Sequence, residues 1–358
     1  MRVLLLTPEY PPARGGIQQV AVGLAEHLDA ETRVVTLANG RNGTGTPGIH
    51  RAWSPKRSGP AAVAALNAAA LRDGLAGPPD VIVSLHLFTA PGALALSRAL
   101  RRPWVQWVHA MEVPQKPALA RLTLPRASAV VAVSKYARSL ALDAGANGRR
   151  VRIVSPGVVV GPTAPVARRL QRPTVLTVSR LAERYKGHDV LARAMPLVSA
   201  HVPDAQWVVV GDGAFRAPIE ALARSTGANA RFVGSVSDEQ RDRWLDGAHV
   251  FSMPSRLPGG GFAGEGFGIV FLEAGLHGLP VVAGNVGGAC DAVVQGETGL
   301  LVDPTDHVAL GRALTDLLTD PERAARMGRA GALRARDHAW PAIAARVMDV
   351  LDGVTTGG

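Results

Sequence analysis

The 358-residue chain has a single cysteine, Cys290, so an intramolecular disulfide is excluded and a reducing cytoplasm is the expected compartment. Aromatic residues make up only 4% of the sequence, whereas sites for single-stranded nucleic acid interleave aromatic rings with cations. The uncharged stretch 274–290 is interrupted by glycines and Pro280, and is not expected to span a membrane. Residues 1–6 are too short for the apolar core of a secretory signal. We therefore expect a cytoplasmic protein that does not bind nucleic acid.

Positive charge is concentrated in the first half of the chain. Residues 1–165 contain 19 Lys and Arg against 8 Asp and Glu, and the formal net charge of the whole chain is +10, so the second half is close to neutral. This asymmetry indicates an anionic partner for the first half, such as a phosphorylated acceptor or an anionic membrane surface. An Arg-rich composition is also typical of GC-rich genomes, and this is the alternative explanation of the charge.

Short apolar runs alternate with helix-like segments through the first half. Continuous apolar runs predict strands that are covered on both faces, and the helices between them predict a parallel sheet. The expected strands are 3–6, 34–37, 81–85, 104–108 and 130–133, and the expected helices are 17–28, 61–75 and 91–100.

A proline-rich, charged segment at 161–173 is expected to link two domains, because the same alternation restarts after it. We predict an α/β protein with two doubly wound, Rossmann-like domains, 1–165 and 166–340, and a final helix 341–358 that packs back on the first. Ligands of such sheets bind at the carboxyl ends of the strands. In the second half the expected strands are 174–178, 207–210, 231–233, 250–253, 281–283 and 299–302, and the expected helices are 189–202, 217–225, 237–245, 268–276 and a long tail from 308.

Two carboxylates, Glu265 and Glu273, bracket the segment Glu-Gly-Phe-Gly-Ile-Val-Phe-Leu-Glu. A glycine-rich approach, 258–264, predicts a loop with outward-facing backbone amides that runs into a helix. Eight positions are slightly more than two helical turns, about 12 Å along the axis, which is the reach of a sugar joined through phosphates to a ribose. The alternative is a capped, solvated helix start with an incidental acidic residue.

Cations and glycines follow other expected strands. Arg180 and Lys186 come after strand 174–178, and this pair suits a diphosphate, although a solvated basic loop is the alternative. Gly15 and Gly16 follow the first strand, where glycines bring backbone amides close to an anion or simply form a tight turn. Gly211 begins a Gly-Asp-Gly sequence that matches only half of a dinucleotide-binding fingerprint.

His109 follows the expected strand 104–108, and Glu112 lies close enough in sequence to pair its carboxylate with the imidazole. The alternative is a hydrogen-bonded structural histidine. We expect no metal at this loop, because it has no second His or Cys at ligand spacing.

These motifs together resemble the retaining glycosyltransferases of family 4. The resemblance extends over nearly the whole chain and is closest to phosphatidylinositol mannosyltransferase-like and actinobacterial natural-product enzymes. It implies the GT-B fold, in which two Rossmann-like domains face each other across a cleft. It rests on Gly15 and Gly16, His109, Arg180 with Lys186, the Gly211 turn, and the pair Glu265 and Glu273.

The resemblance also implies a role for each matching position. Arg180 and Lys186 would hold the donor diphosphate, Glu265 and the amides of Gly266, Phe267 and Gly268 the donor sugar and phosphate, and Glu273 the ribose. Val236 and Asp238 would lie at the base, His109 near the reacting carbon, and Gly15 and Gly16 beside the phosphates. The segment Ser-Pro-Gly-Val-Val-Val at 155–160 departs from the family, whose members usually carry Asp after Gly-Val.

The expected function is metal-independent, cofactor-free hexosyl transfer with retention, from a UDP- or GDP-hexose to a hydroxyl acceptor selected by segments 41–58 and 113–124. One alternative is a GDP-mannose-dependent phosphatidylinositol mannosyltransferase bound peripherally to the inner membrane face, with Arg51, Lys56 and Arg57 preceding the apolar helix 61–75. Another is a UDP-sugar epimerase on a similar scaffold, which would need no acceptor.

Overall fold

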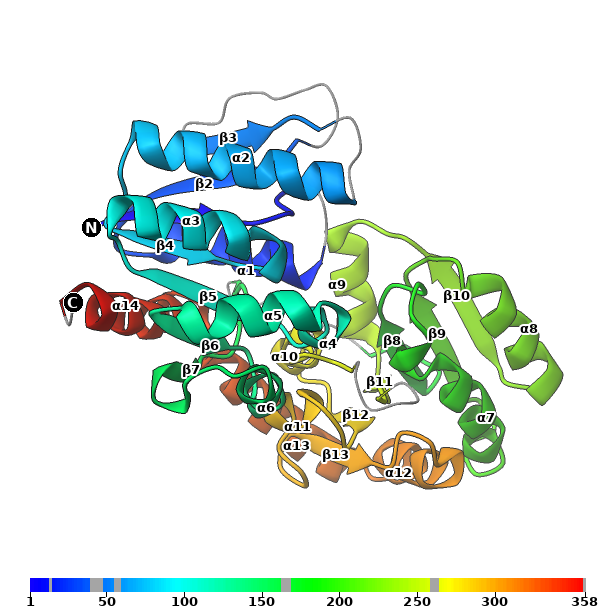
Figure 1. The fold of residues 1–358 in the computed structure, drawn as a ribbon. Helices are drawn as coiled ribbons and strands as arrows, with labels where there is room; N and C mark the ends of the chain where they lie inside the picture. The colour runs from blue at the N-terminus through cyan, green and yellow to red at the C-terminus, as the bar shows by residue number, and fades with distance from the viewer. Residues whose placement is uncertain (13–14, 39–47, 55–58, 162–168, 258–263, 357–358) are drawn as a thin grey trace. The chain divides into compact units, whose positions relative to one another are not determined.

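The computed structural model describes residues 1–12, 15–38, 48–54, 59–161, 169–257 and 264–356 (Figure 1). Most of the expected linker, the glycine-rich approach to Glu265, and much of segment 41–58 lie outside these residues. The chain divides into two compact units: unit 1 comprises Met1–Val158 with Ala339–Gly358, and unit 2 comprises Val159–His338.

Unit 1 is built on a seven-stranded parallel sheet with the order β3-β2-β1-β4-β5-β6-β7. Helices α2 and α3 cover one face, whereas α1 and α14 pack together on the other (Figure 1). The strands are β1 Arg2–Leu6, β2 Glu31–Leu37, β3 Ile49–Ala52, β4 Val81–Ser84, β5 Trp104–Val108, β6 Ala129–Ala132 and β7 Val151–Ile153. The helices are α1 Gly16–His27, α2 Pro60–Ala76, α3 Ala90–Leu100, α4 Glu112–Gln115, α5 Pro117–Thr123, α6 Lys135–Asp143 and α14 Trp340–Thr356.

Unit 2 has a six-stranded parallel sheet with the order β10-β9-β8-β11-β12-β13. Helix α7 packs against α8 and α12, and α10 packs against α13. The strands are β8 Thr174–Val178, β9 Gln206–Val210, β10 Ala230–Gly234, β11 Val250–Met253, β12 Val281–Gly284 and β13 Gly299–Val302. The helices are α7 His188–Ser199, α8 Arg216–Thr226, α9 Asp238–Gly247, α10 Ile269–Leu276, α11 Ala289–Ala292, α12 His307–Thr319 and α13 Pro321–Arg336.

The strands are buried as their uninterrupted apolar runs predict. All residues of β4, β5 and β6 in unit 1, and of β11 and β12 in unit 2, are buried, because helices cover both faces of each sheet. The core of unit 2 gathers Val175 and Trp207 from the strands and Leu191, Met195 and Leu314 from the helices.

Trp340 fixes the return of the chain to unit 1. Its indole lies against Gly23 and Gly157, where an added Cβ would come within 2.1 Å and 2.5 Å of ring atoms, and its backbone N–H donates to Val158 O. Helix α14 therefore packs with α1. None of the helices in the described part of the chain is long and apolar enough to cross a membrane.

Candidate active site

The strand order of the sheet in unit 2 reverses between the neighbouring strands β8 and β11. The chain proceeds from β8 outward to β9 and β10, and then returns to place β11, β12 and β13 on the other side of β8. The loops that leave neighbouring strands β8 and β11 at their carboxyl ends therefore diverge, and doubly wound proteins bind ligands at such a switch point. Lys186 lies in the loop after β8, and Glu265 lies in the loop after β11.

Lys186 and Glu265 form a direct ion pair between these two loops. Only 12% of the Lys186 side chain and 15% of the Glu265 side chain are exposed. The ammonium also lies 4.9 Å from the ring centroid of Tyr185. Burial acts to lower the pKa of Lys186, but the charge of Glu265 and the contact with Tyr185 outweigh it and raise the pKa. Lys186 is therefore a fixed cation at the switch point.

The loop that carries Glu265 is held by its backbone. The Gly288 N–H donates to Glu265 O at 2.8 Å, and a Cβ at Gly288 would lie 1.9 Å from Gly266 O. Phe267 is buried, and Gly268 has φ of 88° at the N-cap of α10, a conformation that favours glycine. Phe271 N–H already donates to Gly268 O at 2.9 Å, so the N–H groups at the start of α10 that lack an intrahelical partner and can donate to an anion are those of Ile269 and Val270.

The expected spacing of the two acids is wrong in one respect. Helix α10 begins at Ile269, so residues 265–268 are not helical and the eight-residue spacing does not correspond to two turns along one axis. Only Glu273 is on the helix. The left-handed Gly268 interrupts the helical path, and a count of residues could not detect this interruption.

Glu273 is coupled to α9. Burial lowers the pKa of Arg241, but Glu273, Asp242 and Asp238 together raise it, so the guanidinium lies within electrostatic reach of all three carboxylates. Arg241 contacts Asp242 at 2.9 Å and Asp238 at 3.3 Å. Val236 and Asp238 lie at the start of α9, whose N-cap Ser237 forms a capping box with Gln240.

Arg180 differs from Lys186 in exposure. Its side chain is 68% exposed and contacts only Glu183, at 3.3 Å, among the ion pairs of the described residues. Gly211 packs directly beside this segment, because a Cβ at Gly211 would lie 1.9 Å from Ser179 O. The Gly211 N–H donates to Gly234 O, so this amide is engaged within the fold.

His188, at the start of α7, is a buried neutral imidazole within electrostatic reach of Lys186. Its Nε2 lies 2.8 Å from Ser179 Oγ. Burial and then Lys186 lower its pKa to about 4; Asp189 opposes this shift and Arg256 adds to it. Arg256, in the loop after β11, donates two hydrogen bonds to the Asp189 carboxylate, at 2.9 Å and 3.1 Å. This pair links the loop after β11 to α7.

In unit 1 the corresponding switch point lies between β1 and β4. After β1, Gly15 is the N-cap of α1 and Gly16 is its first residue, and Gln18 on α1 donates to the carboxylate of Glu9. His109 follows β5, the next strand after β4. Its Nε2 lies 2.8 Å from Leu85 O, and because a carbonyl only accepts, Nε2 carries the hydrogen in the neutral ring.

The expected pairing of the His109 imidazole with Glu112 is wrong. The Glu112 carboxylate accepts instead from the backbone N–H of His109, at 2.6 Å. Ala110, with φ of 117°, turns the chain so that Glu112 reaches back to that backbone group. His86, after β4, was not expected; its Nδ1 accepts from Phe88 N–H, and burial, opposed by Glu112 and supported by His109, lowers its pKa to about 4.

Two family models match almost all of this chain. Residues 14–161 match the model described as glycosyltransferase family 4, and residues 164–334 match that of glycosyl transferases group 1. A GDP-mannose-dependent alpha-(1-6)-phosphatidylinositol monomannoside mannosyltransferase from Mycolicibacterium smegmatis is 34% identical over 376 residues, which cover 98% of each chain. The chain belongs to glycosyltransferase family 4.

Solved structures show the fold of this glycosyltransferase. Sucrose-phosphate synthase from Thermosynechococcus elongatus is 22% identical and superposes with a TM-score of 0.82 over 100% of both chains. HepE from Anabaena, determined in complex with UDP and glucose, is 20% identical and has a TM-score of 0.79 over 99% of this chain and 100% of its own. The predicted GT-B fold, with two Rossmann-like domains, is confirmed.

The structure of the glycosyltransferase places the expected residues in two groups. In unit 2, Lys186 contacts Glu265, and the other expected residues of this half lie at the carboxyl ends of the strands or on the helices that follow them. In unit 1, Gly15, Gly16 and His109 lie at the carboxyl ends of β1 and β5. Sequence reasoning missed His86, His188 and Arg241. Each of these three residues follows a strand or lies near the start of a helix. None belongs to a spaced pair or glycine motif that would have drawn attention to it. Among the described residues, no cluster of three His, Cys, Asp or Glu could hold a metal ion.

Proposed function

We propose that this glycosyltransferase moves a hexosyl group, with retention and without a metal ion, from a UDP- or GDP-hexose to a hydroxyl acceptor. The observation that supports this most strongly is the Lys186–Glu265 ion pair at the switch point of unit 2. A buried cation next to a carboxylate and a helix N-terminus provides separate contacts for the phosphates and the hydroxyls of one ligand.

The donor would be bound along this edge of unit 2. Lys186 and Arg180 bind the diphosphate and neutralise the charge that develops on it as it leaves. Glu265 and the amides of Gly266, Phe267 and Gly268 bind the sugar hydroxyls and phosphate, with Gly211 lining the loop after β9. Glu273 accepts from the ribose hydroxyls, and Val236 and Asp238 flank the base.

Retention follows when the acceptor attacks on the face from which the diphosphate leaves. The acceptor oxygen forms a bond to the anomeric carbon while the bond from that carbon to the phosphate oxygen breaks. The acceptor proton then passes to the departing phosphate oxygen, so charge and atoms balance without a protein nucleophile. In this account Glu265 binds the sugar, His109 of unit 1 lies near the reacting carbon, and Gly15 and Gly16 approach the phosphates.

Two donors are supported by the related proteins. The relative from Mycolicibacterium smegmatis is named for GDP-mannose, and the HepE structure contains UDP and glucose. The relative's acceptor, a phosphatidylinositol monomannoside, together with the excess of 19 Lys and Arg over 8 Asp and Glu in residues 1–165, supports peripheral attachment to an anionic membrane. Membership of a glycosyltransferase family sets aside the epimerase alternative.

A donor screen tests the proposal. The protein is incubated with UDP- and GDP-hexoses in the presence of EDTA, with and without a phosphatidylinositol mannoside acceptor, and the anomeric proton of the product is followed by nuclear magnetic resonance. Transfer with the α-configuration retained is expected from one α-linked donor. Inverted product, or turnover that is abolished by EDTA and restored by a divalent cation, would contradict the proposal. Co-sedimentation with anionic vesicles at low salt tests the membrane partner separately.

A further inference from the structure

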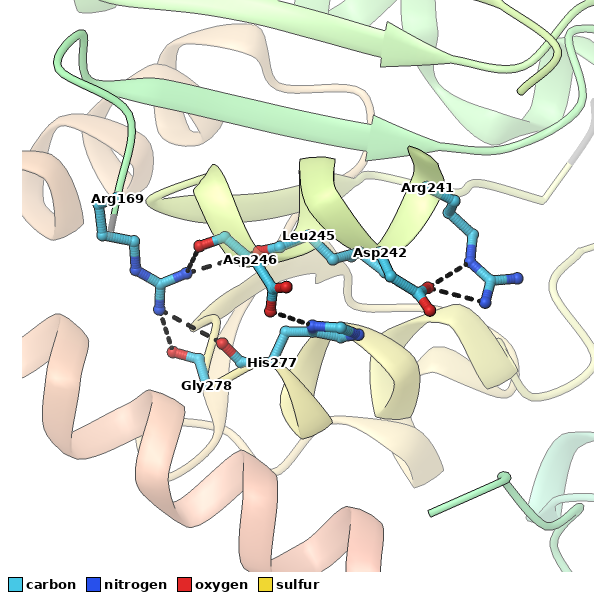
Figure 2. A network of polar contacts seen from close by, with 7 residues as sticks. All are labelled: Arg169, Arg241, Asp242, Leu245, Asp246, His277 and Gly278. Carbon is cyan, nitrogen blue, oxygen red and sulfur yellow. Dashed lines mark hydrogen bonds and ion pairs between the residues drawn. The ribbon is translucent and has the colours of Figure 1, made fainter. Parts of the chain in front are cut away.

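Arg169 joins the carboxyl ends of two helices in unit 2 (Figure 2). One arm of its guanidinium donates to Asp246 O at 3.0 Å and to Leu245 O at 3.5 Å, at the end of α9. The other arm donates to Gly278 O at 3.0 Å and to His277 O at 3.4 Å, just beyond α10. The last carbonyls of a helix lack intrahelical partners and carry partial negative charge, so a cation there satisfies and stabilises both ends.

A second contact joins the same two ends. His277 Nδ1 lies 2.6 Å from Asp246 Oδ1 (Figure 2). Burial lowers the pKa of Arg169, and the charge of Asp246 offsets only part of this shift. Asp246 therefore contacts the imidazole and stabilises the cationic form of Arg169, and the connection between α9 and α10 is a polar network.

Helix α9 also contacts β8, and its Arg241 lies within electrostatic reach of Glu273 on α10, but few apolar contacts hold α9 in place. It is strongly polar, and its only buried residues are Leu245 and Gly247, both at its carboxyl end. Helix α10, by contrast, packs closely on α13, because a Cβ at Gly275 would lie 2.8 Å from Gly331 O. Leu170 N–H also donates to Gly247 O, so Arg169 and Leu170 both hold the carboxyl end of α9. Val236 and Asp238 lie at the opposite, amino-terminal end of this helix.

We propose that Arg169 is a positioning residue for the nucleoside part of the donor. This inference rests on the proposed function, in which Glu273 on α10 binds the ribose and the start of α9 flanks the base. Arg169 fixes the separation of these two contacts by holding both helices at their carboxyl ends. It touches no part of the donor itself.

The length of α9 makes its far end sensitive to the anchor. Ten helical residues span about 15 Å, so a rotation of about 5° at Arg169 moves the start of α9 by about 1 Å. A displacement of that size is enough to weaken a preformed site by an order of magnitude or more. The phosphate contacts at Lys186 do not depend on α9, so the loss is expected in binding of the nucleotide and not in the chemical step.

The test compares Arg169→Lys and Arg169→Ala with wild type in the full-length protein. Lysine keeps the charge but lacks the planar fork, so it cannot reach both helix ends at once. Binding of GDP and of UDP is measured by calorimetry at a temperature where melting curves show every variant folded. We expect about tenfold weaker binding of the nucleotide that wild type prefers, a similar rise in donor KM, and a nearly unchanged kcat.

Arg33→Lys is the matched control. The Arg33 guanidinium also donates to a carbonyl at a helix end, Gly77 O after α2, and contacts Asp73 at 2.9 Å, but it lies in unit 1. This control should lose stability without losing nucleotide affinity. Unchanged nucleotide binding in Arg169→Lys overturns the inference, as does an equal loss in Arg33→Lys. Wild type that binds neither GDP nor UDP contradicts the proposed function instead. If Arg169→Ala does not fold, Arg169→Lys still decides.

Discussion

Lys186 and Glu265 lie 79 positions apart in the sequence, yet their side chains form an ion pair where the loops after β8 and β11 diverge. Neither residue has more than 15% of its side chain exposed. Partial burial makes the pair more than a surface ion pair, because each charge depends on the other for compensation. The pair therefore affects both the stability of unit 2 and the binding of an anionic ligand.

Lys186→Met is expected to lower the free energy of unfolding by about 2–3 kcal/mol, because it leaves the Glu265 carboxylate without its partner. Adding Glu265→Gln should recover part of that loss, since the remaining charge is then removed. Turnover should be lost in both variants. Chemical denaturation of the single and double variants checks this coupling, and simple additivity of the two free-energy changes would contradict it.

Arg180→Ala is expected to leave stability nearly unchanged, because the side chain is 68% exposed and contacts only Glu183 among the described ion pairs. Turnover should nevertheless fall by about 10²-fold, because a cation that stabilises the leaving diphosphate is removed. Arg193→Ala is the control: Arg193 forms a similar exposed pair with Asp189, at 3.6 Å, on α7. Equal activity in the two variants would remove Arg180 from the donor site.

His188→Gln is expected to reduce the acid sensitivity of the fold. The folded pKa of about 4 lies below the ordinary histidine pKa of 6.5, so the unfolded chain binds more protons between these pH values. Wild-type stability is fully present above pH 6.5 and falls as the pH drops toward 4, by about 3 kcal/mol for this group. Glutamine can still bond to Ser179. Urea denaturation from pH 4 to 7 should show that the free energy of unfolding depends less steeply on pH in the variant than in wild type. Some dependence remains, because the pKa of His86 is lowered in the same direction.

Gly288→Ala is expected to displace the Glu265 loop, because the new Cβ would lie 1.9 Å from Gly266 O. We expect a loss of stability of about 2 kcal/mol together with a loss of donor binding, since backbone has to move. Gly353→Ala on α14 is the control, because no atom lies within 4 Å of its Cβ position. Thermal melts and donor KM values for both variants check this, and wild-type behaviour of Gly288→Ala would contradict the proposed loop geometry.

The fold could be predicted from the sequence, whereas the roles of the site residues stay predictions. Uninterrupted apolar runs gave β8, β11 and β13 with the bounds that the structure has, because strands covered on both faces need no alternation. The short strands β3 and β7 were not predicted, because Ile49–Ala52 and Val151–Ile153 contain polar residues and are partly exposed at the edges of the sheet.

Contacts between distant segments could not be predicted. The motifs identified Lys186 and Glu265 individually, but their contact depends on how β11 is placed beside β8. Arg169 and Arg241 have no sequence signal at all. Their roles depend on which helix ends and carboxylates the fold brings to them, and a solvated arginine has the same sequence appearance.

The most direct test of the central claim is a calorimetric titration of wild type and Lys186→Met with GDP and with UDP, in the presence of EDTA. The account predicts that wild type binds at least one of the two nucleotides without a metal ion, and that Lys186→Met, while still folded, binds it at least about tenfold more weakly. Equal affinity in the two proteins would contradict the claim that Lys186 binds the donor diphosphate.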